Sequence, residues 1–508
     1  MIKIFLITLF AINDFFVPKG DLNRNSLYYN AERAVISWDL KSADKFINQL
    51  PDTDPMNYYL KGYREFFAGN YKKSLDLLTI AKEKLGSVKK VNSLYNLVKN
   101  SYKEAEDFKF VETEHFKIFY YPGKDEVLLP YTKETLEKAY NSIGKDLDFF
   151  PAEKIRAEIY PSYESFMRVS TLTRNDIETS GTIALCNYRK VMITSPKATT
   201  RGYRWRDTFS HELVHYFLTR KTRNYAPLWL QEGIAKSEEV RWRSLTQTPL
   251  DSIYQSMLVD AIRKEHFVTF HQMIPSFAKL GSSQEVTLAF AEVMSIIEKI
   301  VRDGGYKELR KLVDASVKYR GNSDLMVKVL GYNNVDDFFK KWKSYITGVN
   351  LERIPGVSLD KPEIRQKSPS NNYFRLSEML KDQRYFKTAA FEMEEAIKRS
   401  KIKSPVMYYK YAFSLINTGD YVKAKKVIRD ILPLFPYYGG LHKLLGFVLM
   451  HNKKYKKAIG EFETALAINP FDPVIHVKLK ELYEQEGNKK LAERENDVLK
   501  VFMKYGGS

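Results

Sequence analysis

The amino-acid sequence predicts an α+β protein that is mostly α-helical, in which a central mixed unit is flanked by helical repeats. Two patterns support this fold class. The C-terminal part repeats every 34 to 35 residues, and self-similarity of that period is typical of stacked helical hairpins. Between residues 115 and 194, strand-like segments alternate with a helical one. The 508 residues are enough for about two to four domains.

In the C-terminal repeats, an alanine recurs at a regular interval. Ala389, Ala424 and Ala458 are 35 and then 34 positions apart, and Ala492 follows after another 34. This is the period of the tetratricopeptide repeat, and a small residue at this place lets two antiparallel helices approach closely. The period therefore predicts four helical hairpins over residues 372–508.

A related unit is predicted near the start of the chain, over residues 25–108. The matching positions are Gly62, Tyr71, Ser74, Leu78 and Ala81 against Gly446, Tyr455, Ala458, Phe462 and Ala465. Stacked helical repeats form concave surfaces that bind partners, so we expect a protein partner for the repeats. The alternative is that the repeats only pack around the central unit.

The central unit is expected over residues 109–350. Alternating residues predict strands at 115–121 and 155–160, and a β-hairpin follows at 181–194. Residues 131–147 and 250–345 have helical spacing. The segment 351–371 is polar and contains proline, which is typical of a linker.

The segment His211-Glu212-Leu213-Val214-His215 carries the most chemical information. Residues four apart lie on one face of a helix, so both histidines can direct a ring nitrogen at one metal ion. Glu212 borders that face and can contact a metal-bound water without being a ligand. Catalytic zinc takes three protein ligands and leaves one position open. Glu232, seventeen positions after His215, is the natural third ligand.

The sequence between these ligands fits a helix, a turn and a second helix. Asp207 is expected to cap the first helix, and 221–224 to form its exit loop. Pro227 is expected to open the second helix, which places Glu232 about one and a half turns into it. The alternative is an amphipathic helix whose histidines only satisfy polar contacts.

Residues 109–350 resemble a peptidase MA-like domain of the gluzincin zinc metallopeptidases, whose relatives include thermolysin. The resemblance is carried by the segments Asp207–His215 and Ala226–Ala235. It implies a thermolysin-like catalytic domain with one zinc ion per chain, bound by His211, His215 and Glu232. It also implies that Glu212 is the general base for hydrolysis of a peptide or protein substrate.

In gluzincins, an edge strand before the metal helix binds extended substrate by backbone pairing. The substrate-binding residues implied here are Ile183, Ala184, Leu185 and Tyr188. The alternative is a plain structural hairpin.

The residue that stabilises the oxyanion stays open, because Phe290 stands where related proteins often have a tyrosine. The candidates are Tyr188, Tyr216, His266 and His271; for the two histidines the alternative is an ordinary surface or packing role.

Glu238 and Glu239 are expected on a solvated helix face. The alternative for Glu239, seven residues after Glu232, is to hold a ligating histidine in place.

Composition limits the remaining possibilities. The net charge is +19, but the lysines are scattered and match no nucleic-acid-binding module, so no nucleic-acid partner is expected. Cys186 is the single cysteine, which excludes an internal disulfide, and it is expected to be a packing residue.

Residues 1–18 resemble a brief secretory signal, with Lys3 before an apolar run too short to span a bilayer. They predict export to the periplasm or cell envelope, with a cytoplasmic location as the alternative. No transmembrane segment is expected.

Two functions therefore compete. The first is a zinc metallopeptidase whose repeats recruit a substrate or partner. The second is an inactive peptidase-like scaffold whose repeats mediate protein–protein interaction.

Overall fold

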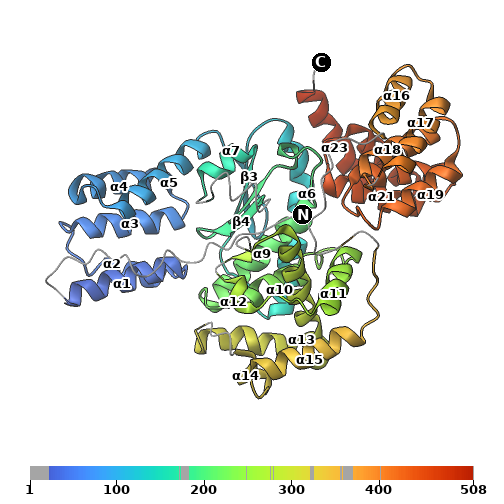
Figure 1. Ribbon diagram of the computed structural model, residues 1–508. Helices are drawn as coiled ribbons and strands as arrows, with labels where there is room; N and C mark the ends of the chain where they lie inside the picture. The colour runs from blue at the N-terminus through green and yellow to red at the C-terminus, as the bar shows by residue number, and fades with distance from the viewer. Residues whose placement is uncertain are drawn as a thin grey trace.

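The protein is mostly helical and contains one small mixed β-sheet (Figure 1). The structure is a computed structural model. It describes residues 22–170, 172, 182–247, 249–274, 276–277, 280–320, 325–354, 357, 370–400 and 402–506. The predicted export signal at 1–18 lies outside the described residues. Within them, no helix is both long and apolar enough to cross a membrane.

The N-terminal region is helical, and its neighbouring helices pack in pairs (Figure 1). Its described helices are α1 (Leu22–Ile36), α2 (Leu40–Ile47), α3 (Pro55–Phe67), α4 (Tyr71–Leu85) and α5 (Lys89–Ala105). Gly62 is one of the positions that this region shares with the C-terminal repeats, and the structure shows why the residue is small. A Cβ atom there would lie 2.7 Å from the Cγ of Leu78 on α4, so a glycine lets α3 and α4 approach closely.

The sheet lies at the centre of the molecule, and among the described residues it has five strands in the order β1-β2-β3-β5-β4. The strands are β1 (Lys109–Glu112), β2 (Phe116–Tyr120), β3 (Ile155–Tyr160), β4 (Ala184–Asn187) and β5 (Lys190–Thr194). Strands β2, β3 and β5 are parallel, whereas β1 and β4 are antiparallel to their neighbours. Strand β4 is therefore an edge strand.

The predicted hairpin is the β4–β5 pair. Its two turn residues, Tyr188 and Arg189, have φ angles of 51° and 60°, as a two-residue type I′ turn requires. Cys186 lies buried in β4, as expected of a packing residue. Strand β1 was not predicted because its four residues are mostly exposed and show no apolar alternation.

Further helices pack on the sheet and extend below it in the view of Figure 1. The described helices between residues 109 and 350 are η1 (Lys124–Leu128), α6 (Leu129–Leu147), α7 (Tyr163–Arg168), η2 (Pro196–Ala198), α9 (Trp205–Thr222), α10 (Leu228–Glu238), α11 (Ser252–Lys264), α12 (Phe270–Met273), α13 (Ser283–Lys318), α14 (Leu325–Leu330) and α15 (Val335–Gly348). Helix α9 packs on β4 and β5, and α10 packs between α9 and α13. The predicted helical character of 250–345 is thus found in the residues that the structure describes.

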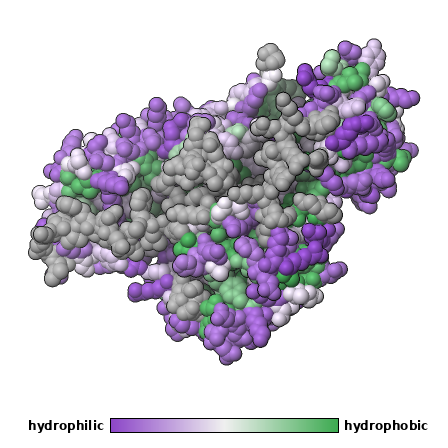
Figure 2. Space-filling view, viewed as in Figure 1, coloured by the Kyte–Doolittle hydropathy of each residue, from purple (hydrophilic) through white to green (hydrophobic). Residues whose placement is uncertain are grey.

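Within residues 370–506, the chain forms four helical hairpins, which confirms the predicted tetratricopeptide-like repeats. Their helices are α16 (Ser370–Asp382), α17 (Phe386–Arg399), α18 (Pro405–Asn417), α19 (Tyr421–Ile431), α20 (Gly439–His451), α21 (Tyr455–Ile468), α22 (Pro473–Gln485) and α23 (Lys489–Tyr505). Hydrophilic residues predominate on the outer face of these repeats in the view of Figure 2. This hydrophilic surface is consistent with a net positive charge whose lysines and arginines are spread over the solvated surface.

A histidine contact recurs in the last two hairpins. The ring of His442 contacts the Glu461 carboxylate at 2.7 Å through Nδ1 and the Pro436 carbonyl at 2.9 Å through Nε2. The corresponding residues 34 positions later are His476, Glu495 and Pro470, with distances of 2.7 and 2.8 Å. Each histidine thus ties the two helices of its hairpin to the preceding turn.

A buried cluster of charges joins the N-terminal helices to the sheet. The fully buried carboxylate of Glu158 on β3 accepts hydrogen bonds from Lys190 on β5 and Tyr71 on α4, each at 2.7 Å. The Arg156 guanidinium also donates to it. Burial alone would raise the pKa of Glu158, but Lys190 and Arg156 outweigh it and hold the pKa well below its usual value.

We expect Glu158→Gln to lower the free energy of unfolding by about 3–5 kcal/mol, because it leaves buried cations without their counter-charge. The measurement is the urea midpoint followed by circular dichroism. Glu112→Gln is the control, since Glu112 pairs with Lys154 on the surface and its loss should leave the midpoint unchanged. An equal midpoint for Glu158→Gln and the control would contradict this role.

Candidate metal centre

Helix α9 carries His211, Glu212 and His215, and it is buried over almost its whole length. The helix ends at Thr222, and Arg223 adopts the left-handed conformation with φ of 52°. This end agrees with the exit loop expected at 221–224.

The expected N-cap of α9 is wrong, because Arg204 precedes the helix and Asp207 lies in its first turn. The Asp207 carboxylate instead accepts hydrogen bonds from Trp242 at 2.9 Å and from Arg243 at 2.8 and 3.0 Å.

Helix α10 supplies the third side chain of the site. Pro227 is its N-cap residue, and the helix starts at Leu228, so Glu232 lies in its second turn as expected. The next residue, Gly233, faces α13, where a Cβ atom would lie 3.0 Å from the Val293 carbonyl oxygen and 2.8 Å from Ile297. The absence of a side chain at this position therefore brings α10 close to α13.

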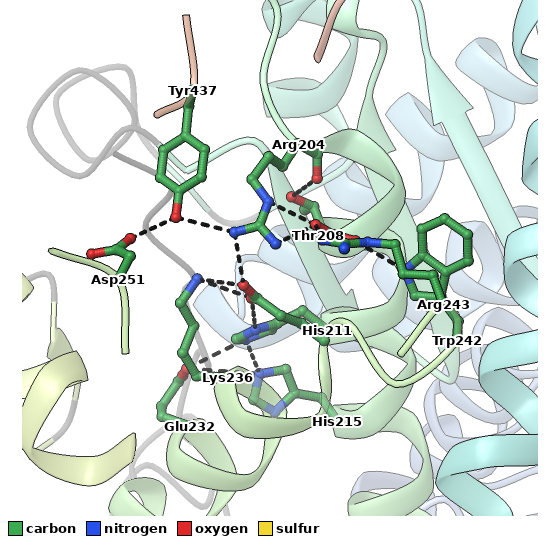
Figure 3. A network of polar contacts seen from close by, with 12 residues as sticks. Arg204, Thr208, His211, His215, Glu232, Lys236, Trp242, Arg243, Asp251 and Tyr437 are labelled. Carbon is green, nitrogen blue, oxygen red and sulfur yellow. Dashed lines mark hydrogen bonds and ion pairs between the residues drawn. The ribbon is translucent and has the colours of Figure 1, made fainter. Parts of the chain in front are cut away.

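The structure brings the three predicted ligands together (Figure 3). The Nε2 atoms of His211 and His215 are 3.1 Å apart, and Glu232 Oε2 lies 3.6 Å from the first and 3.8 Å from the second. All three side chains are at most 1% exposed. Zinc–nitrogen bonds of 2.0–2.1 Å in a tetrahedral site place the ligand atoms about 3.3 Å apart. The observed triangle has this size.

Several polar atoms of the site have no hydrogen-bond partner among the described residues. They are both carboxylate oxygens of Glu212, Glu232 Oε2 and His215 Nδ1. Leaving a buried carboxylate oxygen unpaired is costly, so a group that binds these oxygens would stabilise the site. A zinc ion held by the two imidazoles and Glu232, with a water beside Glu212, fits this donor set.

Glu239 contacts a candidate ligand, and its predicted solvated position is wrong. Its carboxylate lies 3.3 Å from His211 Nδ1 and accepts two hydrogen bonds of 2.9 Å from Lys236. Lys236 and His211 outweigh the effect of burial and lower the pKa of Glu239 to about 2. Glu238, expected on the same solvated face, is also buried and accepts a hydrogen bond from Tyr306. Both residues are enclosed because α10 packs between α9 and α13.

Gln231 is a residue of the site that sequence reasoning missed. Its side-chain nitrogen donates to the Ala226 carbonyl at 2.7 Å, which fixes the orientation of the carboxamide. Burial and the neighbouring His211 hold the pKa of His215 well below its usual value, and Gln231 opposes this shift. A glutamine beside a predicted ligand gives no signal of its own in a single sequence.

Glu212 lies between the two imidazoles in sequence and beside the edge strand in space. Burial raises the pKa of its carboxyl to about 8, while His211 and the nearby backbone of Cys186 on β4 oppose this effect. Edge strand β4 therefore runs next to the candidate base. Its residues Ala184 and Leu185, together with Ile183 just before it, have buried side chains.

Tyr188 does not lie with the other predicted substrate-binding residues. Its ring packs on Phe66 and Phe67 of α3, with centroid distances of 4.9 and 5.7 Å. The turn between β4 and β5 thus contacts the N-terminal helices. Of the four predicted substrate-binding residues, Ile183, Ala184 and Leu185 lie in or next to the edge strand.

The other oxyanion candidates also have partners elsewhere. Tyr216 donates to Glu153 at 3.3 Å, and its ring lies on Trp38. His266 is half-exposed beside Glu285, and His271 is exposed on α12.

Comparisons with known proteins give distant likenesses. No protein-family model matches the chain. Over 97 residues it is 34% identical to the cell division cycle protein 27 homolog A of Arabidopsis thaliana, a match that covers 19% of this chain and 13% of that protein. This match supports the tetratricopeptide-like repeats.

Two solved structures are similar at low TM-scores. MamA from Desulfovibrio magneticus RS-1 has a TM-score of 0.26 at 16% identity and covers 28% of this chain and 80% of its own. Leukotriene A4 hydrolase from Saccharomyces cerevisiae has a TM-score of 0.30 at 12% identity, with 79% and 67% covered. These scores are too low to support an argument about the central unit.

We expect Glu239→Gln to weaken zinc binding by about 10- to 100-fold, because a neutral amide holds the His211 ring less firmly. Zinc affinity is measured by competition with a chromophoric chelator. Glu238→Gln is the matched control, since it alters the adjacent buried carboxyl, which contacts Tyr306 and neither histidine. Equal affinity of the two variants would show that Glu239 does not support the metal site.

Proposed function

We propose that this protein is a zinc-dependent metallopeptidase of the gluzincin type that hydrolyses peptide bonds, and that its central unit is the catalytic domain. The observation that carries the proposal is the buried convergence of His211, His215 and Glu232 with Glu212 beside them. Two ring nitrogens and one carboxylate oxygen are the ligand set of many catalytic zinc sites, which keep one position open.

A zinc ion in this site would polarise the scissile carbonyl and lower the pKa of a bound water. Glu212 would act as the general base: one carboxylate oxygen accepts a proton from the attacking water and later donates it to the leaving amine. Its buried position on the same helix as the two histidines supports this role, because a carboxylate held beside a metal-bound water can accept and return its proton.

Strand β4 would hold the substrate. The pairs Ile183–Thr194, Leu185–Met192 and Asn187–Lys190 alternate with pairs whose backbone groups point away from the partner strand. Ala184 and Cys186 belong to the second kind, so their N–H and C=O groups face the open edge of the sheet. A peptide that pairs there would lie as an added strand beside Glu212.

The C-terminal repeats would recruit the substrate or a protein partner, which is how such repeats usually act. We also propose export to the cell envelope, supported by Lys3 and the apolar run that follows it within residues 1–18.

A second function, an inactive scaffold that retains the metal site, is favoured by one observation. Each candidate for the oxyanion donor contacts other groups or lies exposed, and Phe290 packs on Phe277. Stoichiometric zinc without any cleavage would identify the scaffold.

We expect Glu212→Gln to retain zinc and to lose about 10²- to 10⁴-fold in the cleavage rate, the usual contribution of a general base. The rate is measured on a denatured protein substrate and on a mixed peptide library, with zinc content measured on the same samples. Glu238→Gln should keep the wild-type rate. Equal turnover of Glu212→Gln and wild type would refute the assignment of the base.

Removal of the metal gives an independent test. We expect a zinc chelator to abolish cleavage and added zinc to restore it, and His215→Ala to lose zinc and activity together. Cleavage that persists in the chelated protein would exclude zinc catalysis.

A further inference from the structure

The C-terminal repeats contact the segment that leads into the metal helix. The backbone N–H of Tyr203 donates to the Ile468 carbonyl at the end of α21, at 3.0 Å. The indole of Trp205, the first residue of α9, donates to the Leu466 carbonyl at 3.4 Å. Gly202 has a φ of 72°, and a Cβ atom there would lie 2.0 Å from the Ile468 oxygen. The end of α21 is thus fitted closely against the start of α9.

Tyr437 extends this contact into the polar surroundings of the metal site. It lies in the loop between α19 and α20, and Figure 3 shows its hydroxyl between Arg204 and Asp251. The hydroxyl accepts a hydrogen bond from Arg204 Nη1 at 3.1 Å and donates one to Asp251 at 2.6 Å. Arg204 precedes α9, and Asp251 is the N-cap of α11. One side chain of the repeats therefore links two elements of the central unit.

Arg204 connects Tyr437 to a predicted metal ligand. Its guanidinium donates to Asp207 at 2.6 Å and lies 3.6 Å from the Glu239 carboxylate. Glu239 in turn lies 3.3 Å from Nδ1 of His211. The contacts form a continuous path from Tyr437 through Arg204 and Glu239 to His211. Figure 3 shows Tyr437, Arg204 and His211 of this path.

We propose that Tyr437 is a positioning residue through which the docked repeats set the affinity of the metal site. The Tyr437 hydroxyl fixes the place of Arg204 between Asp207 and Glu239. Arg204 thereby keeps the Glu239 carboxylate directed at the His211 ring, which orients the opposite ring nitrogen toward the metal. This inference rests on the proposed zinc site and adds that the repeats are part of its support.

The neighbouring Tyr438 provides a matched control. Its ring lies near Arg201 and Tyr409, at 5.6 and 6.0 Å, so it shares the docking interface. Within the residues that the structure describes, its hydroxyl makes no hydrogen bond. Tyr438→Phe therefore removes a hydroxyl from the same loop without touching the path to His211.

The test measures zinc affinity of the full-length protein by competition with a chromophoric chelator. We expect Tyr437→Phe to weaken zinc binding about tenfold, at the lower end of outer-shell effects, because it acts through two other residues. The melting temperature of the metal-free protein should stay near the wild-type value. Tyr438→Phe should change neither quantity.

A double-mutant cycle separates this path from a general loosening of the interface. In the Glu239→Gln background, Tyr437→Phe should cause no further loss of affinity, because its effect passes through Glu239. Additive losses, or unchanged affinity in Tyr437→Phe alone, would overturn the inference and leave the zinc site standing. A wild-type protein that binds no zinc would instead remove the proposed site, and this inference with it.

Discussion

The candidate site depends on the burial of the two helices that carry its residues, α9 and α10. Helix α9 packs on the sheet, α10 packs on α9, and α13 closes the other side of α10. Polar groups buried between these helices lose their contact with water. This loss costs free energy unless other partners replace the water. His211, His215 and Glu232 face one another there, and Glu239 contacts the outer ring nitrogen of His211. The Glu212 oxygens, Glu232 Oε2 and His215 Nδ1 have no such partner among the described residues, so the site has the polar atoms to accept a bound ion and water.

The part of the site that sequence reasoning predicted depends on local geometry. His211 and His215 share a helix face because of the helical period, and Glu232 follows after a turn that Pro227 marks. The period of 34 residues predicted the repeat hairpins for the same reason, since each hairpin is a local unit. Patterns of this kind can be predicted because the residues that form them lie close together in the sequence.

The parts that were missed depend on contacts between distant segments. Glu238 and Glu239 were expected on a solvated face, but the packing of α10 between α9 and α13 buries both. For Glu239, the spacing of seven residues from Glu232 indicated the contact with His211 only as the alternative. Tyr188 sits in a hairpin turn whose direction is set by α3, which lies far away in the chain. Strand β1 is defined by its pairing with β2 and not by its own residues. A single sequence has no signal for such partners.

The link between Arg204 and Tyr437 spans 233 positions. During synthesis, helix α9 is made long before the loop that contains Tyr437. The contacts of Tyr203 and Trp205 with the end of α21 can form only after the third repeat has left the ribosome. The proposed zinc site would therefore gain this support only once residue 437 has been made, more than two hundred residues after the helix that carries its two histidines.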